Sequence, residues 1–200
     1  MTTSENGIET AHGIFNSIME KEKIKDYFIE CKNSHKKENI DTAVWNLESS
    51  SLNDVDIKKL EEEIHIVFPK EYRAYIMTAA HQFTVLKGNF DNFFFEDDVD
   101  VELKIVPQPY HEELKYIREM LKENMILVRQ SYLPIGEFDD DGYLCIDLKG
   151  NNEIVWIPFE NCIGFTEREQ FEQEQISIFH EFDDYIKCFF GGEKYIIEDE

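Results

Sequence analysis

The chain has 200 residues, of which 42% are hydrophobic, 14% aromatic and 32% charged. A chain of this size and composition can bury one substantial core, so the intrinsically disordered and collagen-like classes are excluded. The 43 acidic residues outnumber the 20 basic ones, which gives a formal net charge of −23. Nucleic acid is therefore disfavoured as a partner, because binding it requires cationic side chains that displace counterions.

The acidic excess favours a basic partner instead, because opposite charges accelerate association. The excess is largest at the C-terminal end, where residues 151–200 hold 13 acidic and 3 basic side chains. The alternative is that the charge only keeps the protein soluble. Composition alone leaves both readings open.

Neither a membrane segment nor an export signal is visible. No apolar run reaches the roughly 18 residues that are needed to cross a bilayer, and residues 1–6 lack the basic and apolar regions of a signal peptide. The four cysteines form no CxxC pair, so reduced thiols are expected rather than a zinc cluster or a redox motif; they are Cys31, Cys145, Cys162 and Cys188. We therefore expect a cytoplasmic protein without a membrane partner.

Residues 1–50 form the first segment of the chain. Apolar residues at helical spacing predict one or two helices there, and Trp45 is expected to anchor the segment on the main core. We therefore expect a helical N-terminal extension that packs on the main domain. The main domain is predicted to span residues 51–192, and residues 193–200 form an acidic tail.

Two helices are predicted at the start of the main domain. Residues 51–54 offer capping oxygens, and an apolar stripe follows at Ile57, Leu60, Ile64 and Val67. Pro69 is expected to end this helix and to begin a second one over residues 69–81, because proline suits the first turn of a helix. The inward side chains of the second helix are predicted to be Tyr72, Tyr75, Ile76 and Ala79.

The apolar period then shortens towards two, which predicts strands over residues 83–86, 90–95, 102–106, 125–129, 143–148 and 153–157. Residues 149–152 read as the turn of a hairpin between the last two strands. Helices are predicted over residues 110–124 and from 166 to about 190. The expected fold is α+β, with a single, largely antiparallel central sheet flanked by helices.

The motifs of common enzymes are missing. The sequence contains no GxGxxG, GxxxxGK[ST], HExxH or GxSxG, so the usual nucleotide, zinc-protease and hydrolase signatures are absent. The six histidines show no tight ligand spacing and are expected to be ordinary surface or cap residues. We therefore predict no catalytic residue, no cofactor and no metal ligand.

Two acidic clusters are the candidate partner-binding residues. The first comprises Glu96, Asp97, Asp98 and Asp100, and the second comprises Asp139, Asp140 and Asp141. Neither matches the D-x-D-x-D-G spacing of an EF-hand calcium loop. They can be simple turns and acidic edges of a sheet, or a docking surface that steers a cationic protein.

Several motifs resemble the SUKH superfamily, which is named for the yeast cell-wall-synthesis regulators and related bacterial immunity proteins. A helix followed by Phe68, Pro69, Tyr72, Tyr75 and Ile76 is similar to the family's opening "helix, then Leu-Pro-x-x-Tyr". Residues 133–136 (LPIG), 141–148 (DGYLCIDL) and 152–156 (NEIVW) look like its core of an acidic loop, strands and a turn. Residues 179–186 are similar to its C-terminal helix, so the resemblance covers residues 52–190.

The resemblance implies a sheet wrapped by helices, no catalytic centre, and use as an antidote that binds and neutralises a toxin domain, commonly a nuclease. Because nuclease toxins are often basic, this expectation agrees with the acidic composition. The leading hypothesis is a bacterial immunity protein of a polymorphic toxin system. The alternatives are a regulatory scaffold that binds endogenous proteins, as the yeast relatives do, and an uncharacterised enzyme, which would require a deep polar pocket.

Overall fold

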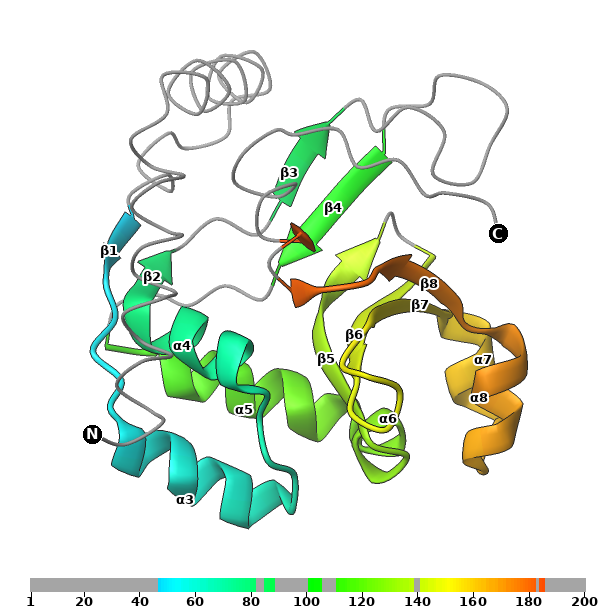
Figure 1. Cartoon of the computed structure of the whole chain (residues 1–200), viewed down its shortest axis with the longest axis horizontal. Helices are drawn as coiled ribbons and strands as arrows, with labels where there is room; N and C mark the ends of the chain where they lie inside the picture. Colours follow the sequence, from blue (N-terminus) through cyan, green and yellow to red (C-terminus); the bar gives the residue numbers. More distant parts are fainter. Residues whose placement is uncertain are drawn as a thin grey trace. The chain divides into compact units, whose positions relative to one another are not determined.

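The computed structural model describes residues 47–81, 85–88, 101–105, 111–138, 141–182 and 184–185 (Figure 1). The predicted extension up to residue 46, the predicted strand 90–95 and the acidic tail lie outside these residues. The described elements fall into two compact units, divided within α5 (Glu113–Glu123) between residues 119 and 120. The first unit holds residues 113–119 of α5 together with β1 (Leu47–Ser49), α3 (Asp54–Ile64), α4 (Lys70–Thr78) and β2 (Ala79–His81).

The second unit is built on an antiparallel sheet of six strands in the order β3-β4-β5-β6-β7-β8. Its strands are β3 (Val85–Gly88), β4 (Val101–Ile105), β5 (Tyr132–Phe138), β6 (Gly142–Asp147), β7 (Ile154–Pro158) and β8 (Ile176–Phe179). Its helices, besides residues 120–123 of α5, are α6 (Met125–Arg129), α7 (Phe159–Gly164) and α8 (Arg168–Glu174). The predicted α+β class with an antiparallel sheet is confirmed.

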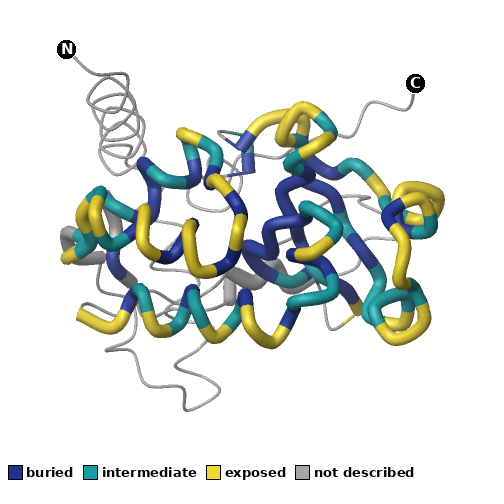
Figure 2. Tube along the Cα trace, turned by 90° about the horizontal axis from the view of Figure 1, so that it is seen from below, coloured by how far each residue is buried: buried dark blue, intermediate teal, exposed yellow. Residues whose placement is uncertain are grey.

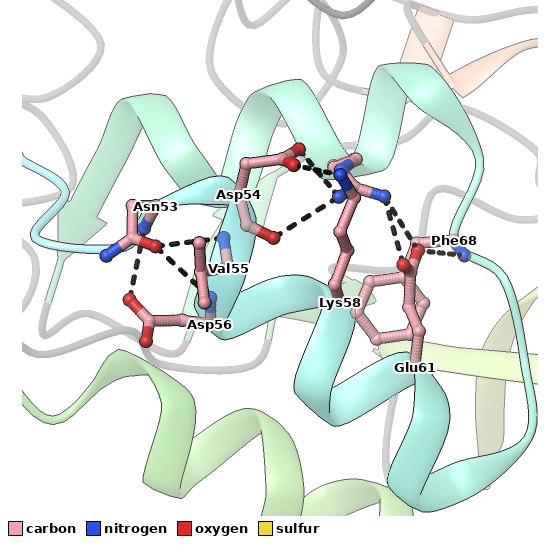
Figure 3. A network of polar contacts seen from close by, with 8 residues as sticks. Asn53, Asp54, Val55, Asp56, Lys58, Glu61 and Phe68 are labelled. Carbon is pink, nitrogen blue, oxygen red and sulfur yellow. Dashed lines mark hydrogen bonds and ion pairs between the residues drawn. The ribbon is translucent and has the colours of Figure 1, made fainter.

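The first predicted helix is confirmed as α3, with Ile57, Leu60 and Ile64 buried. Asn53 caps it: the Asn53 side chain accepts hydrogen bonds from the backbone N–H groups of Val55 and Asp56, at 2.9 and 3.2 Å (Figure 3). The helix ends before Pro69, because His65 takes a left-handed conformation at φ 59°. Helical phase is lost at that point, so the prediction that Val67 faces inward is wrong: its side chain is 77% exposed.

The second predicted helix is confirmed as α4, and Tyr72, Tyr75 and Ile76 are buried as expected. The phenol ring of Tyr72 packs edge-on against Phe68, with 5.3 Å between the ring centroids. The predicted end at residue 81 is wrong, since Ala79–His81 form β2 and pair with β1. The helix ends early because the backbone of Ala79–His81 pairs with strand β1.

A carboxylate joins the serine run to α5 within the first unit. Glu113 is only 1% exposed, and its carboxylate accepts hydrogen bonds from the backbone N–H and the hydroxyl of Ser51, at 2.8 and 2.9 Å. The position of Glu113 in the first turn of α5 also suits a negative charge. These contacts fix residue 51, where the main domain was predicted to begin, against this helix.

Two predicted elements of the second unit are wrong. Residues 125–129 form helix α6 rather than a strand, because the four consecutive apolar residues 125–128 are too few for periodicity to separate a helix from a strand; Leu127 and Val128 are buried. The predicted closing helix breaks after Glu174, where Gln175 is extended and β8 pairs with β7. Beyond β8, the Tyr185 N–H donates to the Glu181 carbonyl at 3.4 Å, which is one helical turn of the predicted end.

The core of the second unit lies between the middle strands and the helices that follow them. Its central cluster is Leu127, Tyr132, Cys145, Val155, Ile157 and Phe171. Helices α7 and α8 both contact β7, and Figure 1 shows them together at the β7–β8 side of the sheet. Buried and exposed stretches alternate along the helical tubes of Figure 2, as amphipathic helices require. The β6–β7 hairpin matches its prediction, with the turn at residues 148–152.

Candidate functional site

The structure places only one of the seven predicted partner-binding acids. Asp141 is exposed and directly precedes β6. The others, Glu96, Asp97, Asp98, Asp100, Asp139 and Asp140, lie outside the described residues. Asp141 is therefore the point from which a site can be built.

A surface hollow of about 380 Å³ adjoins Asp141. We call it the Trp156 hollow; the described residues that line it are Asp141, Trp156, Pro158, Phe159 and Glu160. They come from the start of β6, the end of β7 and the start of α7. Sequence reasoning missed four of these five as site residues, because the hollow forms only when β6 pairs with β7.

Backbone contacts hold the walls of the Trp156 hollow. Gly142 pairs with Pro158 across β6 and β7, and the Phe159 N–H donates to the Asp141 carbonyl at 2.9 Å. Gly142 has no room for a side chain, since a Cβ atom would lie 2.5 Å from the Ile157 carbonyl oxygen and would meet the Trp156 indole. The Asp-Gly pair therefore lets β6 pass close to the Trp156 ring.

The lining combines aromatic rings with carboxylates. Trp156 and Phe159 are half-buried, and the Phe159 ring packs edge-on against Tyr143 with 4.5 Å between centroids. Asp141 and Glu160 are exposed, and no lysine or arginine among the described residues forms an ion pair with either carboxylate. Aromatic faces and carboxylates both attract cations. The Trp156 hollow is thus chemically suited to a basic group.

Helix α7 continues from the Trp156 hollow and has no buried residue. Its Ile163 side chain is 90% exposed, the largest exposed fraction among the large apolar side chains that the structure describes. Val67 and Val55, at 77% and 58%, are exposed in the first unit. Single exposed apolar residues are ordinary on protein surfaces, but Ile163 lies on the same short helix as two residues of the hollow.

A buried ion pair, which sequence reasoning also missed, connects α8 to the β6–β7 turn. Asp147 and Arg168 are only 3% and 8% exposed, and the guanidinium donates to both Asp147 oxygens at 2.6 and 2.7 Å. Asp147 also accepts from the N–H groups of Lys149 and Gly150, both at 3.0 Å. Because these groups satisfy each other, the pair is structural and offers no open chemistry.

A second network, drawn in Figure 3, holds α3 and α4 together. The Glu61 carboxylate is 9% exposed and accepts from the Phe68 N–H at 2.8 Å and from the Arg73 guanidinium at 3.0 Å. Arg73 also donates to Asp54 at 2.7 Å. A hydrogen bond from Lys58 lowers the pKa of Asp54, with help from Arg73. This network explains why the charged side chains of Glu61 and Arg73 are tolerated beside the core.

The two thiols that the structure describes, Cys145 and Cys162, are poorly suited to nucleophilic chemistry. Burial raises the pKa of Cys145 well above its ordinary value, and that of the half-buried Cys162 to about 11. Within the described ranges, no group of three or more His, Cys, Asp or Glu side chains is arranged to hold a metal ion. His65 caps α3, and His111 and His180 are exposed, as predicted for surface or cap histidines.

We expect Cys162 to react slowly with iodoacetamide at neutral pH, because only the thiolate is nucleophilic. Its alkylation rate should rise about tenfold for each pH unit and level off only near pH 11, the pKa that burial gives it. Peptide mass mapping separates Cys162 from the other three cysteines. A plateau near the ordinary thiol value of about 8.5 would contradict this expectation.

The fold described above is α+β and is built on an antiparallel sheet. A family model described as the SMI1 / KNR4 family (SUKH-1) matches residues 51–188, and the chain belongs to this family. The resemblance seen in the motifs is therefore confirmed. A SUKH domain fits an immunity-protein family, and membership of the family suggests a protein partner such as a toxin. No curated protein matches the chain.

Among the helices that the structure describes, none is long and apolar enough to cross a bilayer.

Proposed function

We propose that the protein is a cytoplasmic bacterial immunity protein that binds and neutralises a cognate polymorphic toxin domain. The observation that carries this proposal is membership of the SUKH-1 family over residues 51–188. The protein acts by binding alone, without a catalytic residue or a cofactor. The partner is a protein rather than nucleic acid or a membrane.

The toxin domain in this proposal is basic and is a nuclease. A net charge of −23 supports a basic partner, since complementary charge steers association. The partner-binding acids are those of the two predicted clusters, 96–100 and 139–141. Of these, Asp141 has the surroundings expected of a docking residue, because it is exposed and lines the Trp156 hollow.

Co-expression in a bacterial host tests the proposal. The probe is the product of the gene adjacent to that of this chain, which in this proposal carries the toxin domain, induced with and without the full chain. We expect the chain to restore growth, to prevent nucleic-acid degradation and to co-purify with the toxin domain. The matched control is an unrelated protein of similar size and net charge, which should not protect. Toxicity that is unchanged by the chain, together with no complex by calorimetry, would overturn the proposal.

A regulatory scaffold for endogenous proteins is the second candidate. The observation that favours it is that residues 1–50 lie outside the family match. A chain lacking these residues separates the two functions. An immunity protein should still protect against the toxin domain, because the matched domain is retained, whereas a scaffold that acts through the extension should lose its partner.

A further inference from the structure

We propose that the Trp156 hollow and the exposed face of α7 form a docking surface for an arginine-bearing segment of a basic protein. This inference rests on the proposed function and deepens it, because it assigns the surface and the chemistry of the partner. The occupant is a guanidinium between the carboxylates of Asp141 and Glu160, with an apolar side chain of the partner placed on Ile163.

The shape of the surface supports this assignment. The hollow of about 380 Å³ lies between paired strands and the start of α7, so its walls are set by backbone hydrogen bonds. A concave site that exists before binding costs less ordering on association than a surface that must form. The hollow is within the size range of small ligand pockets, roughly 300–1,000 Å³, and can accept a single side chain.

The lining chemistry favours arginine. A guanidinium stacks on aromatic rings and forms paired hydrogen bonds with carboxylates, whereas a lysine ammonium is a compact, strongly hydrated charge. Both kinds of group line the hollow: Trp156 and Phe159 supply rings, and the carboxylates complement the positive charge. Among the described residues, neither carboxylate forms an ion pair with a lysine or an arginine, so both are open to a cation from a partner.

Helix α7 adds the apolar part of an interface. Protein interfaces combine a few apolar or aromatic anchors with a polar rim. Ile163 is 90% exposed on a helix with no buried residue, and Glu160 of the same helix lines the hollow. An apolar anchor therefore lies on the same short helix as two residues of the hollow, Phe159 and Glu160.

The first test uses nuclear magnetic resonance of the ¹⁵N-labelled full chain, titrated to millimolar concentrations with tetra-arginine amide. We expect saturable shifts of the Trp156 indole N–H and of the amides of residues 160–164, and weaker effects with tetra-lysine amide. A Trp156→Phe variant assigns the indole signal. Shifts confined to another surface, or none, would overturn the inference.

Charge variants sharpen this test. The pair Asp141→Asn and Glu160→Gln should weaken tetra-arginine binding about tenfold, the scale of two partly exposed ion pairs. The control pair, Glu169→Gln and Glu174→Gln on α8, removes the same charge from exposed residues that do not line the hollow. It should leave the affinity nearly unchanged. Equal losses in both pairs would overturn the inference, because net charge alone would then explain binding.

A second arm uses the neighbouring toxin domain. Adding Ile163→Ser to the Asp141 and Glu160 substitutions should weaken toxin binding in calorimetry, while the melting temperature stays near that of the wild type. Wild-type affinity of this variant would overturn the docking surface and leave the proposed function intact. If the wild type does not bind the toxin domain, the proposed function is overturned. The titration with tetra-arginine amide contains no toxin, so it still tests the docking surface independently in that case. Broadening of the same signals with protein concentration alone would identify a second copy as the occupant and overturn the inference.

Discussion

Replacing Arg168 by methionine is expected to lower the free energy of unfolding by about 3–5 kcal/mol. The Asp147 residue is only 3% exposed, and the substitution removes the ionic partner of its carboxylate. It also removes the hydrogen bond to the Gln130 carbonyl at 2.7 Å and the stacking of the guanidinium over Tyr132 at 4.5 Å. Urea unfolding followed by circular dichroism measures the loss.

Two controls separate the buried pair from the other contacts of Arg168. Glu172→Gln removes an exposed partner of the same guanidinium and should cost less than about 1 kcal/mol. The double variant Asp147→Asn with Arg168→Met should be more stable than Arg168→Met alone, because no buried charge is left unpaired. A loss for Arg168→Met no larger than that for Glu172→Gln would contradict the account.

Truncation of Tyr72 to alanine is expected to lower the free energy of unfolding by about 3–5 kcal/mol. The ring is 2% exposed and packs against Phe68 and Tyr75, so its removal leaves a cavity beside α4. Tyr72→Phe keeps the ring and should cost much less. Differential scanning calorimetry compares the variants.

An unchanged melting temperature of Tyr72→Ala would contradict this prediction. Because Tyr72 is buried and belongs to the packing of α3 and α4, the folded fraction of the variant should bind the toxin domain with the wild-type specificity. A selective loss of binding in a fully folded variant would contradict a purely structural role for Tyr72.

The sequence predicts elements well where one apolar face repeats over several turns. The stripe of Ile57, Leu60 and Ile64 and the hairpin turn at residues 149–152 carry strong local signals, and both are confirmed. Prediction from the sequence fails where local backbone geometry or a contact with a distant part of the chain determines where an element ends or which type it is. The left-handed His65 ends α3 early, and pairing with β7 turns residues 176–179 into a strand instead of a helix.

The candidate site shows the same division. The acidic turn that contains Asp141 is visible in the sequence as a run of aspartates before a glycine. Its neighbours in space are not visible, since Trp156 and Glu160 become part of the same hollow only when β6 pairs with β7. The sequence does show a tryptophan and a Pro-Phe-Glu segment next to the predicted hairpin. Only the register of the hairpin, however, shows that these residues lie beside Asp141.

The most direct test of the central claim is the association rate of the neighbouring toxin domain with the variant Asp139→Asn, Asp140→Asn and Asp141→Asn, measured by stopped flow. Asparagine keeps the size and turn preference of aspartate, so the melting temperature should change little. We predict a several-fold fall in the association rate at low salt, which shrinks at physiological salt because the Debye length is then roughly 8 Å. A wild-type rate at low salt, both for this variant and for one neutralised at Glu96, Asp97, Asp98 and Asp100, would contradict the account.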